Sequence, residues 1–212
     1  MRTLISALAL TLLLTVITGL VYPLAVCGLA QVIFPAQARG SLIVRGDKVV
    51  GSSLIGQNFS SARYFQGRPS AAGDKGYDAA NSGGSNLGPT NKALIDAVRL
   101  RLKNFVESNP GTTAHQVPID SLTTSASGLD PEISPATANL QVARVARARG
   151  LSEDQVRRLI AENTRPRAAG IFGEPGVNVL LLNLALDRVA TSHASHDDDK
   201  VMAVLHQNLN EP

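Results

Sequence analysis

The sequence predicts a single N-terminal transmembrane α-helix followed by a small mixed α/β domain that is extracytoplasmic. Two observations predict this fold class. No charged side chain occurs from Thr3 to Ala38, and the rest of the chain alternates short β-favouring runs with segments of helical period. The predicted domains are residues 1–38 as a membrane anchor, 39–190 as the soluble α/β domain, and 191–212 as a polar, disordered tail.

Composition limits the function classes. The 212 residues include one cysteine and no tryptophan, which excludes a large multidomain enzyme, an internal disulfide and a multi-cysteine zinc site. Arg2 is the only charged residue of the first 38, so 19 Lys and Arg residues face 17 Asp and Glu residues in the remainder. A domain so nearly neutral is a poor nucleic-acid binder, and no nucleic-acid partner is predicted.

The apolar segment runs from Leu4 to Phe34, about 31 residues. As a helix rising ~1.5 Å per residue it exceeds the ~30 Å hydrocarbon core, which predicts one tilted or kinked span in contact with membrane lipid. Ala36-Gln37-Ala38 matches a cleavage site, so a secretory signal is the alternative. Signal cores have only roughly 7 to 15 apolar residues, which favours a retained anchor. Pro23 is expected to kink the helix because it cannot donate to the Gly19 carbonyl.

One face of this helix carries small and hydroxylated side chains, which are suited to packing against another membrane helix. The candidate partner-contact residues are Thr11, Thr15, Thr18, Gly19 and Tyr22. In the alternative interpretation, each threonine hydroxyl bonds a preceding carbonyl of its own helix in a lone anchor. The stripe favours a partner helix.

The orientation of the span does not follow from charge, because Arg2 and the amino terminus oppose Arg39, Arg45 and Lys48. Long domains translocate largely regardless of their charge, and a two-residue tail before the apolar run is typical of a signal anchor. The N-terminus is therefore expected in the cytoplasm and the soluble domain outside.

Turn residues and periodicity predict the first soluble elements. Two β-favouring runs, 41–44 and 49–55, predict a hairpin. The Gly- and Ser-rich stretch 56–89 predicts a long loop, and loops of this length are often functional. Residues 91–108 have helical period until Asn-Pro-Gly ends it, and an extended run is expected around 117–124.

Three further helices are predicted. The first begins at the N-cap Ser134 and ends at Gly150, and the second runs from a capping box at Ser152 to about Asn163. The third is strongly apolar and covers residues 177–190. The first two helices and the segment after them carry the arginines 144, 147, 149, 157, 158, 165 and 167. This basic surface is interpreted either as a solvated face or as a contact with a partner or lipid headgroups.

No common nucleophile, phosphate-loop or metal motif occurs, so no catalytic residue and no metal ligand is predicted. His115 is the one general-base candidate outside the tail. Asp130 and Glu132, beside two prolines, are interpreted as turn residues rather than a catalytic carboxylate pair. A Gly/Ser loop offers backbone amides that could cradle an anion, with a tight structural turn as the favoured alternative. Its weak candidate residues are Ser82, Gly83, Gly84, Ser85 and Asn86.

Six segments, in order, resemble the C subunit family of the bacterial Kdp potassium-transporting P-type ATPase. They are Thr18 to Pro23, Gly51 to Gln57, Tyr64 to Ser70, Asn81 to Pro89, Ser127 to Pro135, and Gly173 to Val179 without Gly176. Together they cover about residues 4–190. Two departures occur: Glu132 stands where the family usually has His, and the tail from about Thr191 runs past the family's usual end.

The resemblance implies a non-catalytic, single-pass accessory subunit of the bacterial inner membrane, with its soluble domain in the periplasm. The implied partners are a channel-like potassium-binding subunit, an ATP-hydrolysing P-type subunit and a very small membrane peptide. It implies a catalytic chaperone that raises the ATP affinity of the hydrolysing subunit. ATP and potassium then belong to the complex, and no cofactor is assigned to this chain.

Two rival functions remain open from the residues alone. One is a secreted hydrolase that is released after Ala38 and uses His115 with a serine. The other is a membrane-tethered metal-binding module built on His193, His196 and the aspartates 197–199, although a disordered tail is the favoured interpretation.

Overall fold

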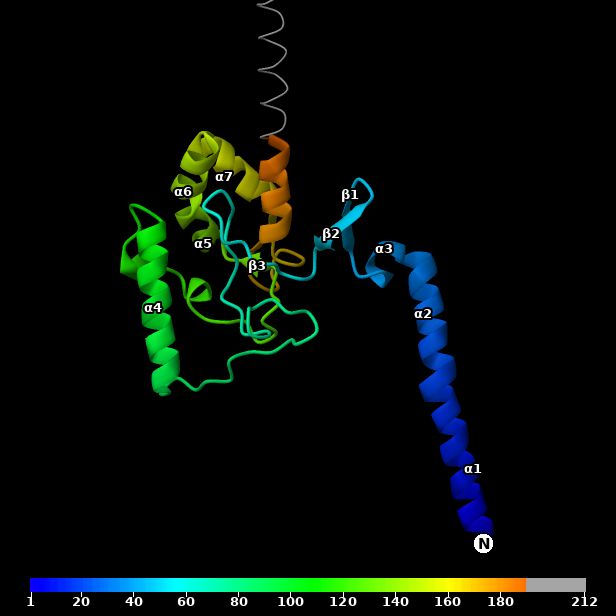
Figure 1. The fold of residues 1–212 in the computed structure, drawn as a ribbon. Coiled ribbons are helices and arrows are strands. Elements are labelled where there is room, and N and C mark those ends of the chain that lie inside the picture. Colours follow the sequence, from blue (N-terminus) through cyan, green and yellow to red (C-terminus); the bar gives the residue numbers. More distant parts are fainter. Residues whose placement is uncertain (190–212) are drawn as a thin grey trace, which may run out of the picture. The chain divides into compact units, whose positions relative to one another are not determined.

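The computed structural model describes residues 1–189. The chain forms two compact units, Met1–Leu54 and Ile55–Pro212, and each is described by itself. Figure 1 labels the helices and strands. The predicted tail, residues 191–212, lies outside the described residues.

The first unit begins with a continuous helix of three parts, α1 (Arg2–Val16), the π-helical η1 (Ile17–Val21) and α2 (Tyr22–Ile33). The 32 residues Arg2–Ile33 are long and apolar enough to cross a membrane, and no side chain among them is buried within the chain. This agrees with the predicted span.

Pro23 lies in the first turn of α2, directly after the π-helical turn. The Tyr22 amide donates to the Ile17 carbonyl, five residues earlier, instead of making the α-helical bond. A π-helical turn is one of the ways in which a helix accommodates a proline that lacks an amide hydrogen.

After the short helix α3 (Pro35–Ala38), the predicted hairpin is confirmed as β1 (Leu42–Arg45) paired antiparallel with β2 (Lys48–Ser52). The turn uses Gly46 at φ +60°, a conformation that glycine adopts without strain.

The second unit begins with the predicted long loop and continues into α4 (Lys92–Ser108), whose N-cap Asn91 accepts a hydrogen bond from the Ala93 amide. The extended run expected around 117–124 is wrong. The segment instead contains the short 3₁₀ turn η3 (Ile119–Ser121), and a first such turn, η2 (Ala114–Gln116), precedes it. A capping box between Thr113 and Gln116 stabilises the first of them.

The helix predicted from Ser134 to Gly150 forms as two pieces, α5 (Pro135–Leu140) and α6 (Val142–Arg149), which Gln141 separates. Ser134 caps α5 as predicted, and Gly150 ends α6 at φ +66°. The capping box of Ser152 with Gln155 opens α7 (Glu153–Glu162), also as predicted.

A small antiparallel sheet has the order β3 (Glu132–Ile133), β5 (Gly176–Asn178), β4 (Thr164–Arg165). The last helix therefore begins at Val179 rather than at residue 177 and is described to residue 189. Strands of two or three residues carry too little alternation to be found by pattern.

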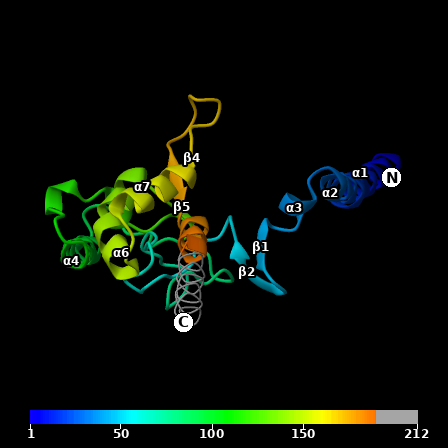
Figure 2. The ribbon, with the colours of Figure 1, turned by 90° about the horizontal axis from the view of Figure 1, so that it is seen from above.

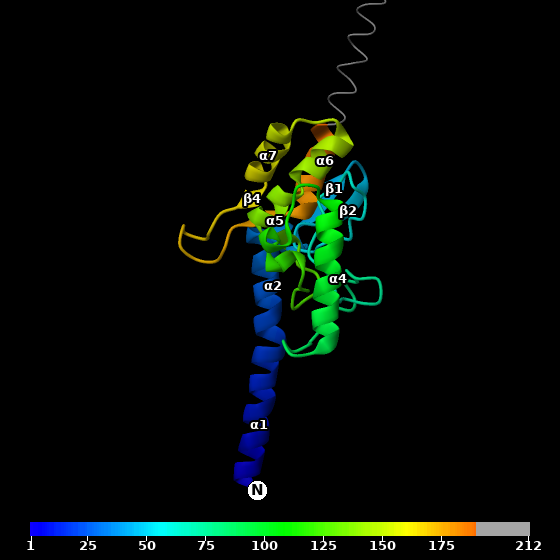
Figure 3. The same ribbon diagram turned by 90° about the vertical axis from the view of Figure 1, so that its left-hand side faces the viewer.

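The hydrophobic core of this unit lies between α5, α6, α7, β5 and the last helix (Figure 2). Its fully buried side chains include Phe65 from the long loop and Val142, Val145, Val156, Leu182 and Leu186 from the helices. Helix α4 buries no residue completely and lies at the edge of the unit (Figure 3). The predicted small mixed α/β region is confirmed.

Candidate functional site

An extended loop segment crosses the helical core without joining a sheet. The Phe65 amide donates to Asn183 Oδ1 at 2.8 Å, and Asn183 Nδ2 donates back to the Phe65 carbonyl at 3.0 Å. Gln141 holds Gln66 in the same way, at 2.8 and 3.1 Å. Two buried side-chain amides thus take the place of neighbouring strands and satisfy the backbone of the segment. Gln141 is also the residue that separates α5 from α6.

Two arginines of the predicted basic surface face inward. Arg144 is 8% exposed and donates to the carbonyl oxygens of Ala62 and Tyr64, at 2.7 and 2.9 Å. Burial lowers the pKa of Arg144 to about 10. The Arg149 side chain is 1% exposed and pairs with Asp187 at 2.9 Å. Both interpretations of the basic surface, solvated face and partner contact, are therefore wrong for Arg144 and Arg149. A count of charges along the sequence does not show which arginine side chains are buried.

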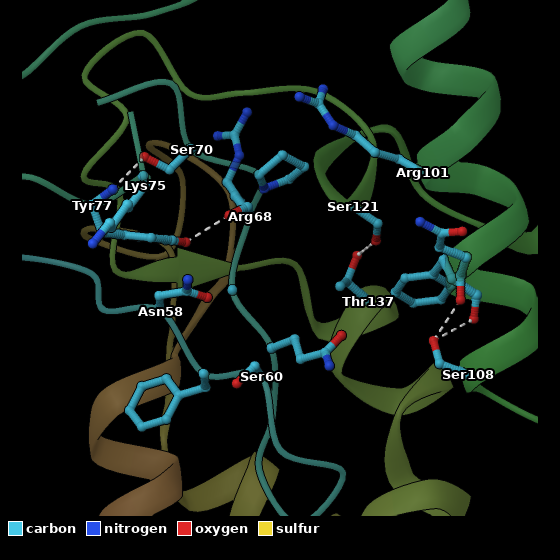
Figure 4. A pocket seen from close by; sticks show the side chains of 17 residues that line it. Asn58, Ser60, Arg68, Ser70, Lys75, Tyr77, Arg101, Ser108, Ser121 and Thr137 are labelled. Atoms are coloured by element: carbon cyan, nitrogen blue, oxygen red, sulfur yellow. Dashed lines mark hydrogen bonds between the residues drawn. The ribbon is translucent and has the colours of Figure 1, made fainter. Parts of the chain in front are cut away.

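A cleft of about 370 Å³ opens on the other side of this loop segment (Figure 4). It lies between the loop, α4, η3 and α5. Its lining residues are Asn58, Phe59, Ser60, Gln66, Gly67, Arg68, Pro69, Ser70, Lys75, Gly76, Tyr77, Arg101, Asn104, Phe105, Ser108, Ser121 and Thr137.

Hydrogen bonds from the loop hold the wall around Tyr77. The Tyr77 hydroxyl donates to the Arg68 carbonyl at 2.6 Å, and its amide donates to Ser70 Oγ at 2.8 Å. Ser70 Oγ in turn donates to the Gly128 carbonyl at 2.6 Å. Burial, with a smaller contribution from the Asp130 charge, raises the pKa of Tyr77 to about 12. The phenol therefore stays protonated and acts as a hydrogen-bond donor at neutral pH.

The charged lining of the cleft is entirely positive. Arg68, Lys75 and Arg101 line it, and the lining includes no Asp or Glu. Arg68 is ion-paired with Asp130 at 2.9 Å, while its buried Nε has no hydrogen-bond partner. Arg101 donates to the Leu122 carbonyl at 2.9 Å.

The predicted Gly/Ser loop lies outside this cleft. The Gly83 amide donates to the Ser127 carbonyl at 2.8 Å, and Ser82 Oγ donates to the same oxygen at 3.0 Å. Gly84 packs against the backbone of Ala126, where a Cβ would lie 3.1 Å from the carbonyl oxygen. These contacts are those of a structural turn. An anion-binding role for Ser82 to Asn86 stays a prediction.

The remaining candidate groups are held in local contacts. Asp130 Oδ1 accepts from the Glu132 amide at 3.0 Å, which is the predicted turn. Glu132 forms a two-pronged ion pair with Arg165, at 2.8 and 2.7 Å. His115 is exposed, and its Nε2 lies 3.2 Å from Thr113 Oγ1. This contact of His115 with a hydroxyl is exposed, and the same Thr113 hydroxyl donates to Gln116 Oε1 at 2.7 Å in the capping box of η2.

The stripe in the membrane helix is exposed throughout. Thr15 Oγ1 donates to the Thr11 carbonyl at 2.8 Å, and Thr18 Oγ1 donates to the Leu14 carbonyl at 2.7 Å. Two hydroxyls are thus satisfied within the helix, as in the alternative interpretation, while a Cβ at Gly19 would meet no atom within 4 Å. Contact of Thr11, Thr15, Thr18, Gly19 and Tyr22 with a partner stays a prediction.

Among residues 1–189, no group of three or more His, Cys, Asp or Glu side chains could hold a metal ion. The His193, His196 and 197–199 cluster lies outside the described residues.

Sequence reasoning missed the cleft. Arg68 and Lys75 belong to the long loop and Arg101 to α4, and of the three only Arg68 lies in a segment that carries the family resemblance, the stretch from Tyr64 to Ser70. A signal existed in that stretch, because it combines one arginine with small residues inside a long loop.

The fold and its contacts define a class: a small α/β unit preceded by one helix that could span a membrane, in which the candidate catalytic groups of the described residues serve structural contacts.

Comparison with known proteins identifies the family. Residues 4–188 match the family model of the K+-transporting ATPase, c chain. The potassium-transporting ATPase KdpC subunit of Polynucleobacter asymbioticus is 56% identical over 182 residues, covering 86% of this chain and 96% of the relative. The KdpC subunit of Variovorax paradoxus is 56% identical over 186 residues, and the KdpC subunit of Rhodospirillum rubrum is 57% identical over 187 residues. Each of these two comparisons covers 88% of this chain and 96% of the relative. The chain belongs to the KdpC family of potassium-transporting ATPase subunits.

Proposed function

We propose that this chain is a non-catalytic accessory subunit of an ATP-driven potassium uptake complex, which it stabilises and whose ATP affinity it raises. The observation that carries the proposal is the family match over residues 4–188, with relatives named as KdpC subunits over nearly their whole length. The structural use of Asp130, Glu132 and Arg144 supports a subunit without chemistry of its own.

The proposed partners are the channel-like potassium-binding subunit, the P-type hydrolysing subunit and the very small membrane peptide. We place the N-terminus in the cytoplasm and the α/β unit in the periplasm of a bacterial inner membrane. ATP is hydrolysed on the opposite side, so an effect on its affinity requires a coupling free energy between distinct sites. The helix Arg2–Ile33 supplies the physical link through the bilayer.

The test of the chaperone role compares the purified complex with and without this chain. Potassium-stimulated ATP hydrolysis is measured over a range of ATP concentrations. The proposal expects a raised KM for ATP when the chain is omitted, with the remaining subunits still folded. An unchanged KM would remove the chaperone role. Failure of the chain to co-purify with any pump subunit would overturn the accessory function as a whole.

Placement is tested with single cysteines, because Cys27 is the chain's one native cysteine. In a Cys27→Ser background, Glu107→Cys introduces a thiol on the exposed face of α4, and Thr3→Cys introduces one at the N-terminus. A membrane-impermeant maleimide added to cells with a permeabilised outer membrane should label position 107 and spare position 3. The opposite pattern would reverse the proposed orientation.

A further inference from the structure

The cleft between the long loop and α4 presents positive charge that the chain itself leaves partly uncompensated. Of its three cations, only Arg68 has a carboxylate partner, Asp130. Arg101 and Lys75 form no ion pair with any described residue. Asp120, next to the lining residue Ser121, accepts from the Ser134 amide and from Thr137 Oγ1, so it is already used. The positive charges of Arg101 and Lys75 are therefore not balanced by a carboxylate in the lining of the cleft.

Unused hydrogen-bond donors lie in the same place. A guanidinium has five N–H donors, and Arg101 uses Nη1 alone, on the Leu122 carbonyl. Arg68 Nε is buried without an acceptor. Arg68 comes from the loop and Arg101 from α4, and Figure 4 shows both side chains at the cleft. Planar carboxylates match the fork geometry of a guanidinium.

The rest of the wall favours a peptide over a free ion. Phe59, Phe105 and Pro69 line the cleft beside the cations. Arginine with aromatic anchors is the composition of protein–protein hot spots. The wall is preformed, because Tyr77 and Ser70 are held by short hydrogen bonds to the backbone. A preformed wall lowers the ordering cost of binding.

We propose that this cleft docks an acidic side chain, Asp or Glu, of another subunit of the same ATPase, through Arg101 and Lys75, with Arg68 in the wall beside them. The inference rests on the proposed function, because the acidic group belongs to an assembly partner. Its chemistry is a carboxylate flanked by apolar residues that contact Phe59 and Phe105.

Zero-length crosslinking tests the proposal directly. A carbodiimide joins a lysine amine to a carboxylate in contact with it, with loss of water, so Lys75 in the purified complex should become linked to an Asp or Glu of another subunit. Lys92, which is paired with Asp96 inside α4, is the internal control for the reagent. Lys75→Arg keeps the charge but removes the amine, so it should abolish the crosslink while the complex still assembles. A Lys92–Asp96 link without any intersubunit link from Lys75 would overturn the proposal.

Charge reversal tests the energetic role. Lys75→Glu and Arg101→Glu should each lower the amount of co-purified subunits at least tenfold, with a smaller loss at high salt. Arg99→Glu makes the same change on the same helix at a side chain that is 77% exposed and outside the cleft, and should have no effect. Lys75 has no hydrogen bond or ion pair with a described residue, so its reversal keeps the fold intact even if Arg101→Glu unfolds it.

The outcomes separate the two proposals. Normal assembly of both cleft variants overturns the docking role and leaves the accessory function standing. A wild-type chain that does not assemble overturns both. The full-length chain is also titrated alone, in detergent, with inorganic phosphate. Saturable phosphate binding that Arg101→Glu abolishes, together with normal assembly of that variant, would assign the cleft to a free anion and overturn the docking role.

Discussion

Arg144 donates from Nη1 to the Tyr64 carbonyl at 2.9 Å, so that a buried cation of α6 holds the backbone of the long loop. The same guanidinium bonds Ala62 and the side chains of Asn109 and Gln141, and every partner is a neutral oxygen. Desolvation lowers the pKa of Arg144 to about 10, and the four neutral acceptors offset this cost.

Arg144→Ala should lower the free energy of unfolding by about 3–5 kcal/mol, because it leaves buried carbonyl and amide oxygens without donors. Arg147→Ala, three residues on at an exposed position, should change it by less than about 0.5 kcal/mol. Urea unfolding of the detergent-solubilised chain measures both. Equal effects of the two substitutions would show that the buried network is not stabilising.

Gly128→Ala should destabilise the chain by about 3 kcal/mol or more. Gly128 has φ +66°, and a Cβ there would lie 2.6 Å from the Gly83 carbonyl oxygen and 2.8 Å from the Ala72 amide nitrogen. Backbone strain and overpacking act together at this site. Gly88→Ala is the control, since its Cβ would meet nothing within 4 Å. Thermal unfolding measures the melting temperatures of both variants. A Gly128→Ala melting temperature equal to that of the control would contradict the prediction.

The contribution of Tyr77 to the free energy of unfolding should fall as the pH rises from 10 to 12, while Arg144, whose pKa is lowered to about 10, contributes in the opposite direction. In this window the unfolded chain releases the Tyr77 proton, while the folded chain retains it because the pKa of Tyr77 is raised to about 12. The loss amounts to up to about 3 kcal/mol, at ~1.4 kcal/mol per pKa unit. Urea unfolding of the wild type and of Tyr77→Phe at several pH values measures the difference, and the free energy of unfolding of the variant should fall less, or rise more, than that of the wild type over this window. The same pH dependence in that variant would assign the change to other groups.

Replacing Thr15, Thr18 and Gly19 together by leucine should prevent assembly with the other subunits. A side chain at Gly19 meets nothing within this chain, so a loss of co-purification would report a clash with a partner helix. A matched variant replaces Leu12, Leu13 and Leu20 by isoleucine and should assemble normally. Normal assembly of the leucine variant would leave the threonines with only their bonds inside the helix.

Local patterns predicted the elements whose cause is local. The hairpin, α4 and the caps at Ser134 and Ser152 all follow from residues within one or two turns of the chain. The capping box of Thr113 with Gln116 was also present in the sequence, and it would have predicted the turn η2.

The interruption at Gln141 and the cleft could not be predicted in this way. Gln141 separates α5 from α6, and its side-chain amide bonds Gln66, which lies 75 residues earlier. Arg68 and Lys75 come from the long loop and Arg101 from α4, and only the folded chain brings the helix and the loop to one cavity. The burial of Arg144 and Arg149 could not be predicted for the same reason, since a charge count does not distinguish surface residues from core residues.

The side-chain amides of Gln141 and Asn183 attach the cleft wall rigidly to the helical core, because each forms two hydrogen bonds with the loop backbone. Gln66 lines the cleft, yet its backbone is bonded to the junction of α5 and α6, while neighbouring Phe65 is bonded to the last helix. The backbone at this wall cannot move outward unless the two helices shift or four hydrogen bonds break. A segment that binds in the cleft and displaces this wall would therefore also shift the helices that carry Gln141 and Asn183, whereas an unattached loop would move alone.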